Sequence, residues 1–328
     1  MALLSCDLKE FYKRLIVSDN IFICTHLNPD GDTIGSVLAL QRVLKFYGKK
    51  VFVYSQDGIP DNCKFLKDVE KIISSVLPTD LENYDLFLFV DCNDFKRVGL
   101  ENEIATNFNE MAIIDHHVKT ENKADFALID EKASSTAQLV YDMLIACEVK
   151  IDEIMAEYLL CGIICDTGAF KFSNTDAHTF YTSAKLVESG GDTARIVKEY
   201  FDSKPLSALK LTGHVLNNLE LYDNGKIIIG YVSKAVMDDL NATREDTEGI
   251  NAQINSLKGV VFSAFIREVE INVFRCSFRG NGKIDCNKLA IAFGGGGHIN
   301  AAGATIKDTY ENALESILQE ARKWTDFL

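Results

Sequence analysis

Residues 21–35, IFICTHLNPDGDTIG, limit what this 328-residue chain can fold into more than any other stretch. The segment opens with the apolar run IFIC, which predicts a buried strand. A polar loop follows, in which Asn28-Pro29 favours extended backbone and Gly31 permits a tight turn. Residues 33–47 then predict a helix.

The loop gathers one imidazole and two carboxylates, His26, Asp30 and Asp32, at the carboxyl end of the predicted strand. Such groups are costly to bring together unless a cation lies between them, and a divalent metal is the usual one. Each residue alone has a simpler explanation: Asp32 as a helix N-cap, Asp30 as a turn residue and His26 as a strand-end histidine. The three together favour a metal site.

Short apolar runs alternate with helical patterns farther along the chain. Strands are predicted at 50–55, 85–90 and 111–114, and helices at 8–18, 133–147 and 151–164. Because the strands are apolar on both faces, we expect an α/β fold class with a larger N-terminal domain, a mainly parallel sheet covered by helices on both faces. Ligands of such sheets bind beyond the carboxyl ends of the strands.

More acidic and imidazole residues stand at those ends. Asp91 follows 85–90, His116 and His117 follow 111–114, and Asp166 follows the last predicted helix. Together with the first loop this gives six ligand side chains: His26, Asp30, Asp32, Asp91, His116 and Asp166. Six ligands exceed one tetrahedral site, so we expect two divalent metal ions bridged by Asp91. This mixture suits Mn²⁺ best, with Mg²⁺ or Co²⁺ as alternatives. The two helix histidines elsewhere, His178 and His214, are expected to be ordinary helix residues.

Two cations about 3.5–4 Å apart can share a hydroxide and clamp a phosphoryl oxygen, which is the chemistry of phosphoester hydrolysis. The net charge, 34 − 48 = −14, argues against a long nucleic-acid duplex as ligand. It allows a short anionic substrate held by metals and a few arginines, and it predicts a locally positive cleft on an acidic body.

Composition also suggests the cellular compartment of the protein. It has no run of about 18 apolar residues, so no membrane span or membrane partner is expected, and its first residues do not resemble a signal peptide. Nine cysteines without a CxxC pair fit neither a disulfide framework nor a zinc ribbon. Several lie in apolar runs and are interpreted as reduced packing residues of a cytoplasmic protein: Cys24, Cys92, Cys161, Cys165 and Cys276.

The second half of the chain has a different pattern. Residues 192–219 predict a long helical stretch, and strands linked by tight turns follow from about residue 226, with a short helix at 285–292. Four glycines, 294–297, can close backbone N–H groups on an anion, helped by a helix starting near His298 and by Arg279. A flexible loop is the simpler alternative. We therefore expect domains at 1–190 and 223–328, joined by a helical linker at 191–222.

Four motifs resemble those of the DHH phosphoesterase family: HLNPDGDTIGS, VDC, IIDHH and CDTGAF. Near the carboxyl end, GGGGHINAAG resembles the signature of the DHH-associated substrate domain. The resemblance implies a smaller α/β C-terminal domain, with the active site in the cleft between the domains. It implies that His26 and Asp30 bind one metal, that Asp32, His116 and Asp166 bind the other, and that Asp91 binds both. His117 would face the scissile phosphate, and Arg97 would bind substrate phosphate.

Within that family the chain is most similar to the stand-alone oligoribonucleases (nanoRNases) that also act on 3′-phosphoadenosine-5′-phosphate (pAp). The resemblance implies a short RNA or nucleotide substrate bound by Arg279, Gly295, Gly296, Gly297 and His298, with His117, Asp91 and Arg97 catalytic. One departure is Gly280, where the family often has Ser after the arginine. Alternatives are a phosphodiesterase for pApA, pGpG or c-di-AMP, an inorganic pyrophosphatase, and an inactive nucleotide sensor. A homodimer is compatible with the sequence.

Overall fold

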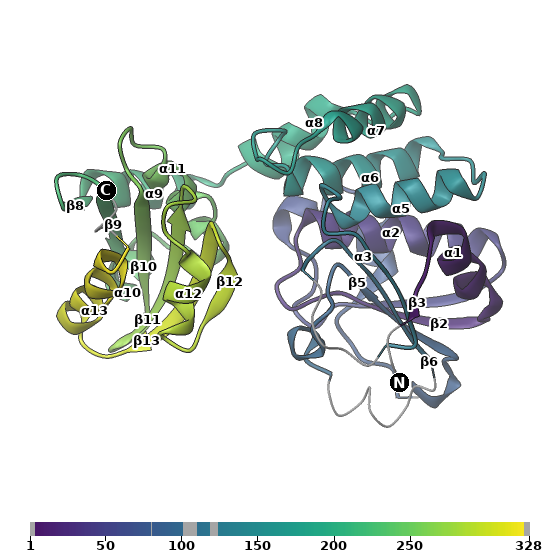
Figure 1. The fold of residues 1–328 in the computed structure, drawn as a ribbon, viewed down its shortest axis with the longest axis horizontal. Coiled ribbons are helices and arrows are strands. Elements are labelled where there is room, and N and C mark those ends of the chain that lie inside the picture. The colour runs from purple at the N-terminus through teal and green to yellow at the C-terminus, as the bar shows by residue number, and fades with distance from the viewer. Residues whose placement is uncertain (1–3, 80, 101–109, 119–123, 325–328) are drawn as a thin grey trace. The chain divides into compact units, whose positions relative to one another are not determined.

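The computed structural model describes residues 4–79, 81–100, 110–118 and 124–324. The chain forms two compact units, Met1–Ser203 and Lys204–Leu328 (Figure 1).

The first unit is built on a sheet of seven strands, all of whose pairings are parallel. The strands are β1 (Leu4–Ser5), β2 (Asn20–Cys24), β3 (Lys50–Tyr54), β4 (Ile73–Ser74), β5 (Leu86–Val90), β6 (Glu110–Asp115) and β7 (Phe126–Ile129). Their order is β1-β7-β6-β5-β2-β3-β4. The predicted α/β class is confirmed. Of the strands in this sheet, the sequence analysis did not predict β1, β4 and β7.

The strands bury side chains on both faces. Ile21 and Ile23 of β2 belong to the main core with the helices, whereas Phe22 lies in a second cluster on the opposite face. There the ring of Phe22 stacks on that of Phe87, with centroids 5.1 Å apart. Alternate residues of a strand point to opposite faces, so a strand that is apolar throughout must be covered on both.

Helices of the first unit cover the main core. They are α1 (Leu8–Val17), α2 (Gly31–Phe46), α3 (Val69–Ile72), α5 (Thr136–Ala146), α6 (Glu153–Asp166), α7 (Ala177–Glu188) and α8 (Thr193–Val197). In Figure 1 α5, α6 and α7 form successive layers above the sheet. A Cβ on Gly35 would lie 2.2 Å from the carbonyl oxygen of Tyr158, and one on Gly162 would lie 2.5 Å from Cβ of Ala137. These glycines let α2, α5 and α6 approach closely.

The strand order reverses direction at β2 and β5. The chain passes from β2 outward to β3 on one side, whereas β5 begins the series that runs to the other side. The loops after two such neighbouring strands diverge and leave a crevice at their carboxyl ends. His26 follows β2 and Asp91 follows β5, so both predicted ligands border this crevice.

The second unit holds a six-stranded mixed sheet in the order β12-β13-β11-β10-β9-β8. Its strands are β8 (Glu220–Tyr222), β9 (Ile227–Val232), β10 (Phe262–Glu270), β11 (Val273–Gly280), β12 (Gly296–His298) and β13 (Ala301–Lys307). Its helices are α9 (Leu206–Asn217), α10 (Lys234–Asp239), α11 (Ile250–Asn255), α12 (Cys286–Ile291) and α13 (Tyr310–Arg322). Two hydrophobic clusters lie on its opposite faces, one packed by α12 and α13, the other by α9 and α11.

Three details differ from expectation. The stretch 192–219 is not one helix: α8 runs into a π-helix (Lys198–Asp202), and the chain breaks before α9, whose N-cap is Pro205. The strands β9 and β10 pair in parallel through α10 and α11 rather than through a tight turn. The third difference concerns the glycine run, where a strand replaces the predicted helix near His298.

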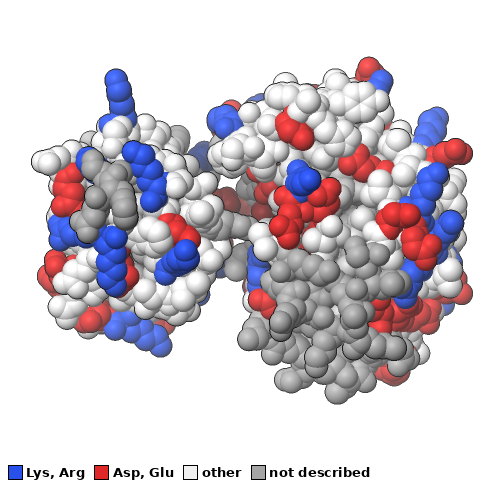
Figure 2. Space-filling model, in the orientation of Figure 1, with Lys and Arg blue, Asp and Glu red and all other residues white. Residues whose placement is uncertain are grey.

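None of the described helices is long and apolar enough to cross a membrane. On the face shown in Figure 2, lysines and arginines are interspersed with aspartates and glutamates on both units.

Candidate metal centre

Asp91 lies at the point where the predicted ligands meet. It follows β5 directly, is 1% exposed, and has a positive φ of 60°, a strained conformation that clusters at functional sites. Thr33 Oγ1 donates to its Oδ2 at 2.6 Å and Thr136 Oγ1 donates to its Oδ1 at 2.9 Å. The carboxylate is therefore fixed from both sides by the first turns of α2 and α5.

A first group consists of His26, Asp30 and Asp91, whose ligand atoms all lie within 4.8 Å of one another. Asp30 is the N-cap of α2 and accepts from the backbone N–H groups of residues 32 and 33. Nδ1 of His26 lies 2.8 Å from the carbonyl oxygen of Leu27, which can only accept, so Nδ1 carries the proton. When the ring is neutral, it therefore presents the lone pair of Nε2, 3.4 Å from Asp91 Oδ2.

A second group consists of Asp32, His116 and Asp166. His116 Nδ1 lies 3.2 Å from the carbonyl oxygen of Ala133, so by the same argument Nε2 carries the lone pair. Its distances to the carboxylates are 3.7 Å to Asp91 Oδ1, 3.6 Å to Asp166 Oδ2 and 3.9 Å to Asp32 Oδ2. This Nε2 atom is buried and makes no hydrogen bond to any described residue.

The carboxylates of the second group are packed at high electrostatic cost. Asp32 is completely buried; it accepts from the backbone N–H groups of Thr136 and Ala137 at 2.7 and 2.8 Å. Burial and the nearby carboxylates of Asp91 and Asp166 nevertheless raise its pKa well above the usual value. For Asp166, burial above all and then Asp30 and Asp91 raise the pKa to about 7, against the opposing effect of His116.

These residues therefore fit a cation. Four carboxylates converge with two imidazole lone pairs, and one of those lone pairs is buried without a hydrogen-bond donor. Bound cations compensate both features, since they accept the lone pair and neutralise the like charges. Burial raises the pKa of Asp91, but His26, His117 and His116 lower it overall when their rings are protonated.

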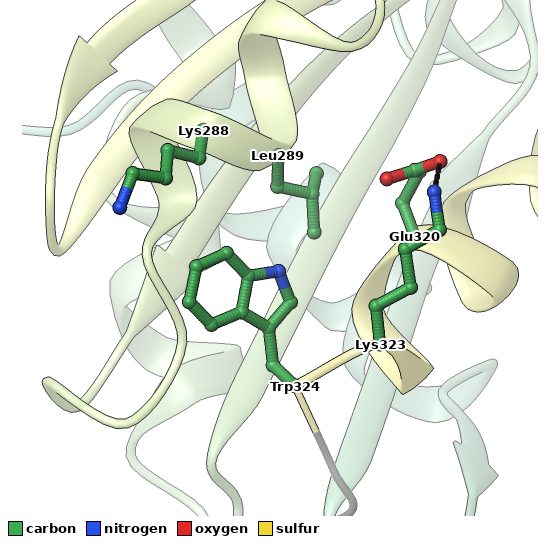
Figure 3. A pocket seen from close by; sticks show the side chains of 5 residues that line it. All are labelled: Lys288, Leu289, Glu320, Lys323 and Trp324. Atoms are coloured by element: carbon green, nitrogen blue, oxygen red, sulfur yellow. Dashed lines mark hydrogen bonds and ion pairs between the residues drawn. The ribbon is translucent and has the colours of Figure 1, made fainter.

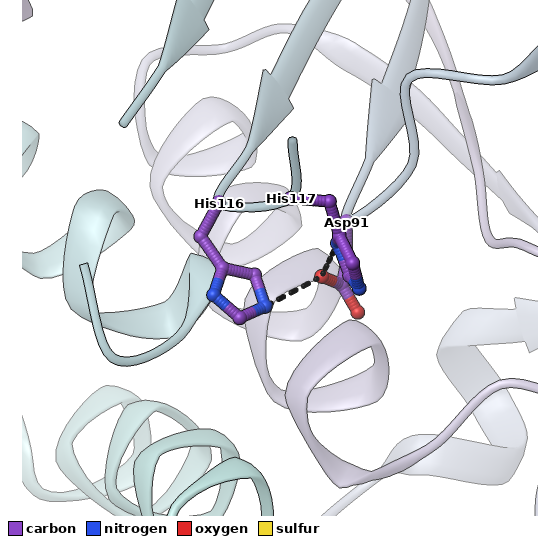
Figure 4. A group of neighbouring side chains, drawn as sticks. All are labelled: Asp91, His116 and His117. Atoms are coloured by element: carbon purple, nitrogen blue, oxygen red, sulfur yellow. Dashed lines mark ion pairs between the residues drawn. The ribbon is translucent and has the colours of Figure 1, made fainter. Parts of the chain in front are cut away.

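His117 lies beside the same carboxylate but has a different partner. Its Nδ1 is 2.7 Å from Asp115 Oδ1 and 3.5 Å from Asp91 Oδ1. Asp115 is fully buried and also accepts from the backbone N–H of His117 and from Asn93 Nδ2. Although burial lowers it, the hydrogen bond to Asp115 and the charge of Asp91 raise the pKa of His117 to about 9. Figure 4 shows that His116 and His117 approach Asp91 from the loop after β6.

Arg97 is exposed, in the 3₁₀ turn Phe95–Val98 that follows β5. Its carbonyl oxygen accepts from the backbone N–H of Leu27 at 2.6 Å, which joins this turn to the loop that carries His26. The positive charge of Arg97 acts on His117 to lower the pKa of that imidazole. The predicted phosphate-binding arginine thus lies at the border of the same site.

The predicted substrate residues of the second unit come together on its sheet. Arg279 of β11 pairs with Ala301 of β13, which in turn pairs with His298 of β12. Arg279 and His298 therefore occupy one row across three strands. Burial lowers the pKa of Arg279, so this guanidinium lies where a charged partner is favourable.

The glycine run has a structural explanation that the sequence did not reveal. The N–H groups of Gly294 and Gly295 bond to carbonyls of Ile291 and Ala290 and so end α12. The N–H of Gly297 donates to Asn287 Oδ1 at 3.0 Å. A Cβ on Gly295 would lie 2.1 Å from the carbonyl oxygen of Gly303. The run is a helix end followed by a tightly packed strand.

Sequence reasoning missed the residues that hold the ligands in place. Thr33 and Thr136 bond to Asp91, Asp115 bonds to His117, and Asn174 Nδ2 lies 3.2 Å from Asp166 Oδ2. Asp115 could have been found, since it precedes the two histidines directly. The others stand on distant segments, and no local pattern marks them.

All nine cysteines are free thiols. Burial raises the pKa of Cys92 to about 12 and shifts those of Cys24, Cys161 and Cys165 upward as well. Their thiols therefore stay protonated, and their interpretation as packing residues agrees with these environments.

An open hollow of about 350 Å³ lies on the second unit between α12 and α13 (Figure 3). Its walls are Lys288, Leu289, Glu320, Lys323 and Trp324. Both of its lysines are paired with carboxylates of their own helices, Lys288 with Asp285 at 3.4 Å and Lys323 with Glu320. The hollow thus has no excess of positive charge for a phosphate.

Buried carboxylates that require cations, placed at the strand ends of a parallel sheet, suit an enzyme that hydrolyses phosphoesters. The chain belongs to the DHH family of metal-dependent phosphoesterases: residues 20–163 match "DHH family, N-terminal domain" and residues 224–326 match "DHHA1 domain". The predicted family and the predicted hydrolase class are confirmed.

Several known proteins are similar to this chain over nearly their whole length. The bifunctional oligoribonuclease and PAP phosphatase NrnA of Thermus thermophilus is 30% identical over 311 residues, which cover 93% of this chain and 91% of that protein. The protein of the same name from Bacillus subtilis is 25% identical, with coverages of 90% and 92%. An exopolyphosphatase-related protein from Bacteroides fragilis has a similar crystal structure, with a TM-score of 0.89, 29% identity and coverages of 98% and 96%.

Proposed function

We propose that this chain hydrolyses short oligoribonucleotides to nucleoside monophosphates, and pAp to AMP and phosphate, with two Mn²⁺ ions bound by the six predicted ligands. The observation that carries the proposal is the pair of ligand groups His26–Asp30–Asp91 and Asp32–His116–Asp166. Asp91 belongs to the first group and lies 3.7 Å from the imidazole of the second. The substrate class comes from relatives named oligoribonuclease and PAP phosphatase.

Bound divalent ions would supply a water of lowered pKa and neutralise the phosphoryl oxygens. Asp91 orients both ligand groups, because its two oxygens are each fixed by a threonine hydroxyl. His117 is held by Asp115 through Nδ1, so the substrate faces its Nε2. Arg97, on the turn joined to the His26 loop, stabilises charge on the phosphoryl group.

A turnover assay with Mn²⁺ tests the proposal. The substrates are pAp, RNAs of two to ten nucleotides, pGpG and c-di-AMP, and the readout is release of phosphate or of nucleoside monophosphate. We expect turnover of pAp and of the shorter RNAs, and loss of nearly all turnover in Asp91→Ala. No Mn²⁺-dependent turnover of any of these substrates would refute the proposal and favour the nucleotide sensor.

A phosphodiesterase for dinucleotides is the second candidate. The cyclic-di-AMP phosphodiesterase PdeA of Listeria monocytogenes is 27% identical over 310 residues, but this match covers only 45% of that protein. The near-complete match to the NrnA proteins favours the oligoribonuclease. Preferential turnover of pGpG or c-di-AMP over pAp and RNA would reverse this order.

We also propose that the second unit holds the substrate through Arg279, His298 and the glycines 295–297. Arg279→Ala should raise KM and leave kcat largely intact, because this arginine binds substrate away from the reacting phosphate. Arg275→Ala is the matched control: it is exposed on the same strand, four residues away, and pairs with Thr305 instead. Equal loss of kcat in Arg279→Ala and Asp91→Ala would contradict this division of roles.

A further inference from the structure

The loop that directly follows the proposed ligand Asp166 holds an aromatic ring in solvent. This loop joins α6 to α7, which pack side by side (Figure 1). Phe172 lies in it with 57% of its surface exposed. Its ring lies over Gly168, since a Cβ on that glycine would be 2.5 Å from Cζ of Phe172. Gly168 is two residues after Asp166, so their Cα atoms are at most about 8 Å apart.

The backbone that presents this ring is unusual. Three successive residues, Gly168, Ala169 and Phe170, have positive φ values of 56°, 56° and 64°. Glycine adopts this region freely, but a bulky aromatic residue such as Phe170 rarely does. Strained backbone of this kind persists only where its surroundings enforce it, and it clusters at functional sites.

The surroundings do enforce this conformation. The N–H of Ala169 donates to the carbonyl oxygen of Ile164 at 2.8 Å, and the N–H of Phe172 donates to that of Thr167 at 3.0 Å. The ring of Phe170 is turned inward and stacks on Phe180, with centroids 5.3 Å apart. The strained backbone thus packs one aromatic ring, partly buried, against the core and leaves another, Phe172, exposed at a fixed position.

The loop is also tied to the metal ligand itself. Asn174 Nδ2 lies 3.1 Å from the carbonyl oxygen and 3.2 Å from Oδ2 of Asp166, and 2.8 Å from the carbonyl oxygen of Ser134. Phe172 therefore stands between two anchors, Thr167 and Asn174, that both adjoin Asp166. Its position relative to that carboxylate is set by hydrogen bonds rather than by a flexible tether.

We propose that Phe172 is a nucleobase-stacking subsite for the nucleotide that carries the scissile phosphate. The inference rests on the proposed function, since it requires a nucleotide at the metal centre. Exposed aromatic rings stack on any base through its π-face, so this contact would favour nucleotides over other phosphoesters without selecting a base sequence. The subsite would therefore make the enzyme select nucleotide substrates over small phosphate monoesters that lack a base.

The test combines a protein variant with a substrate variant. KM is measured for a dinucleotide with natural bases and for the same dinucleotide lacking the base next to the scissile phosphate. Removal of the base should raise KM for the unmodified protein by about 5- to 100-fold, the equivalent of one stacked base. Phe172→Ala should raise KM by the same factor for the natural dinucleotide and leave KM for the abasic one unchanged.

Two further variants control for structure. Phe172→Tyr keeps the ring and should retain the KM of the unmodified protein. Phe46→Ala removes another exposed ring, 83% exposed, at the far end of α2 and should leave both KM values unchanged. Equal KM increases for both substrates in Phe172→Ala, or none, would overturn the subsite while the enzyme still turns over. Absence of turnover by the unmodified protein would instead refute the proposed function.

Discussion

At the scale of single residues, Asp115 is the group whose role can be separated from metal binding. Its Oδ1 accepts from His117, and its other oxygen accepts from Asn93 Nδ2. In Asp115→Asn, an amide facing Asn93 with its oxygen must turn its NH₂ toward His117, so the imidazole loses both the acceptor of its Nδ1–H and a negative charge that raises its pKa. We expect kcat to fall about 10²- to 10⁴-fold, while bound Mn²⁺, measured by atomic emission, stays at the unmodified level.

Asp130→Asn provides the control for that change. Asp130 also follows a strand of the parallel sheet, but its carboxylate accepts from the backbone N–H of Lys132 and does not contact an imidazole of the site. This variant should keep the unmodified kcat. Loss of Mn²⁺ in Asp115→Asn would show that Asp115 acts through the ligands instead of through His117.

The six proposed ligands could be predicted because they lie in the short polar segments that follow apolar runs, where a charged residue has no packing role. Their partners could not. Thr33 and Thr136 lie 58 and 45 positions from Asp91 in the chain, and they reach it only because α2 and α5 begin at the same edge of the sheet. Such contacts depend on the packing of helices, which a strand-end pattern does not contain.

At the scale of elements, the approach of α2 to α6 fixes where the two ligand groups lie. A Cβ on Gly35 would be 2.2 Å from the carbonyl oxygen of Tyr158, a backbone atom that cannot move aside. Gly35→Ala should therefore push the helices apart and destabilise the first unit by about 1–3 kcal/mol or more. Urea unfolding followed by circular dichroism measures this change.

Gly213→Ala is the same chemical change at a helical glycine of α9, where nothing lies within 4 Å of the new methyl group. There the better helix propensity of alanine should stabilise the second unit by up to about 1 kcal/mol. If both substitutions had the same effect, close helix packing would not explain Gly35.

The elements themselves were predictable to different degrees. The strands of the first unit were found because they are apolar on both faces and end in polar residues. The helix predicted near His298 was wrong: the strand β12 lies there, and the close contact of Gly295 with Gly303 on the neighbouring strand could not be read from the sequence. The single helix predicted over 192–219 was wrong, because the residue preceding a proline disfavours helical backbone and Pro205 is the N-cap of a new helix.

At the scale of the whole molecule, the two units have separate cores. Each of the four hydrophobic clusters of the described residues draws its members from one unit alone. Cooperative unfolding requires shared buried contacts, so the chain should unfold in two transitions. All the proposed metal ligands belong to the first unit, and its sheet and helices hold them without a residue of the second.

The sole tryptophan, Trp324, packs against a core of the second unit and reports on that unit alone. Mn²⁺ at about 100 times its dissociation constant should stabilise the unit that binds it by about 2.7 kcal/mol. For a unit of this size we expect its melting temperature, followed by circular dichroism, to rise by roughly 5–10 °C. The transition followed by tryptophan fluorescence should not move, and chelation should reverse the first shift only. An equal shift of both transitions would mean that the metal centre draws on both units.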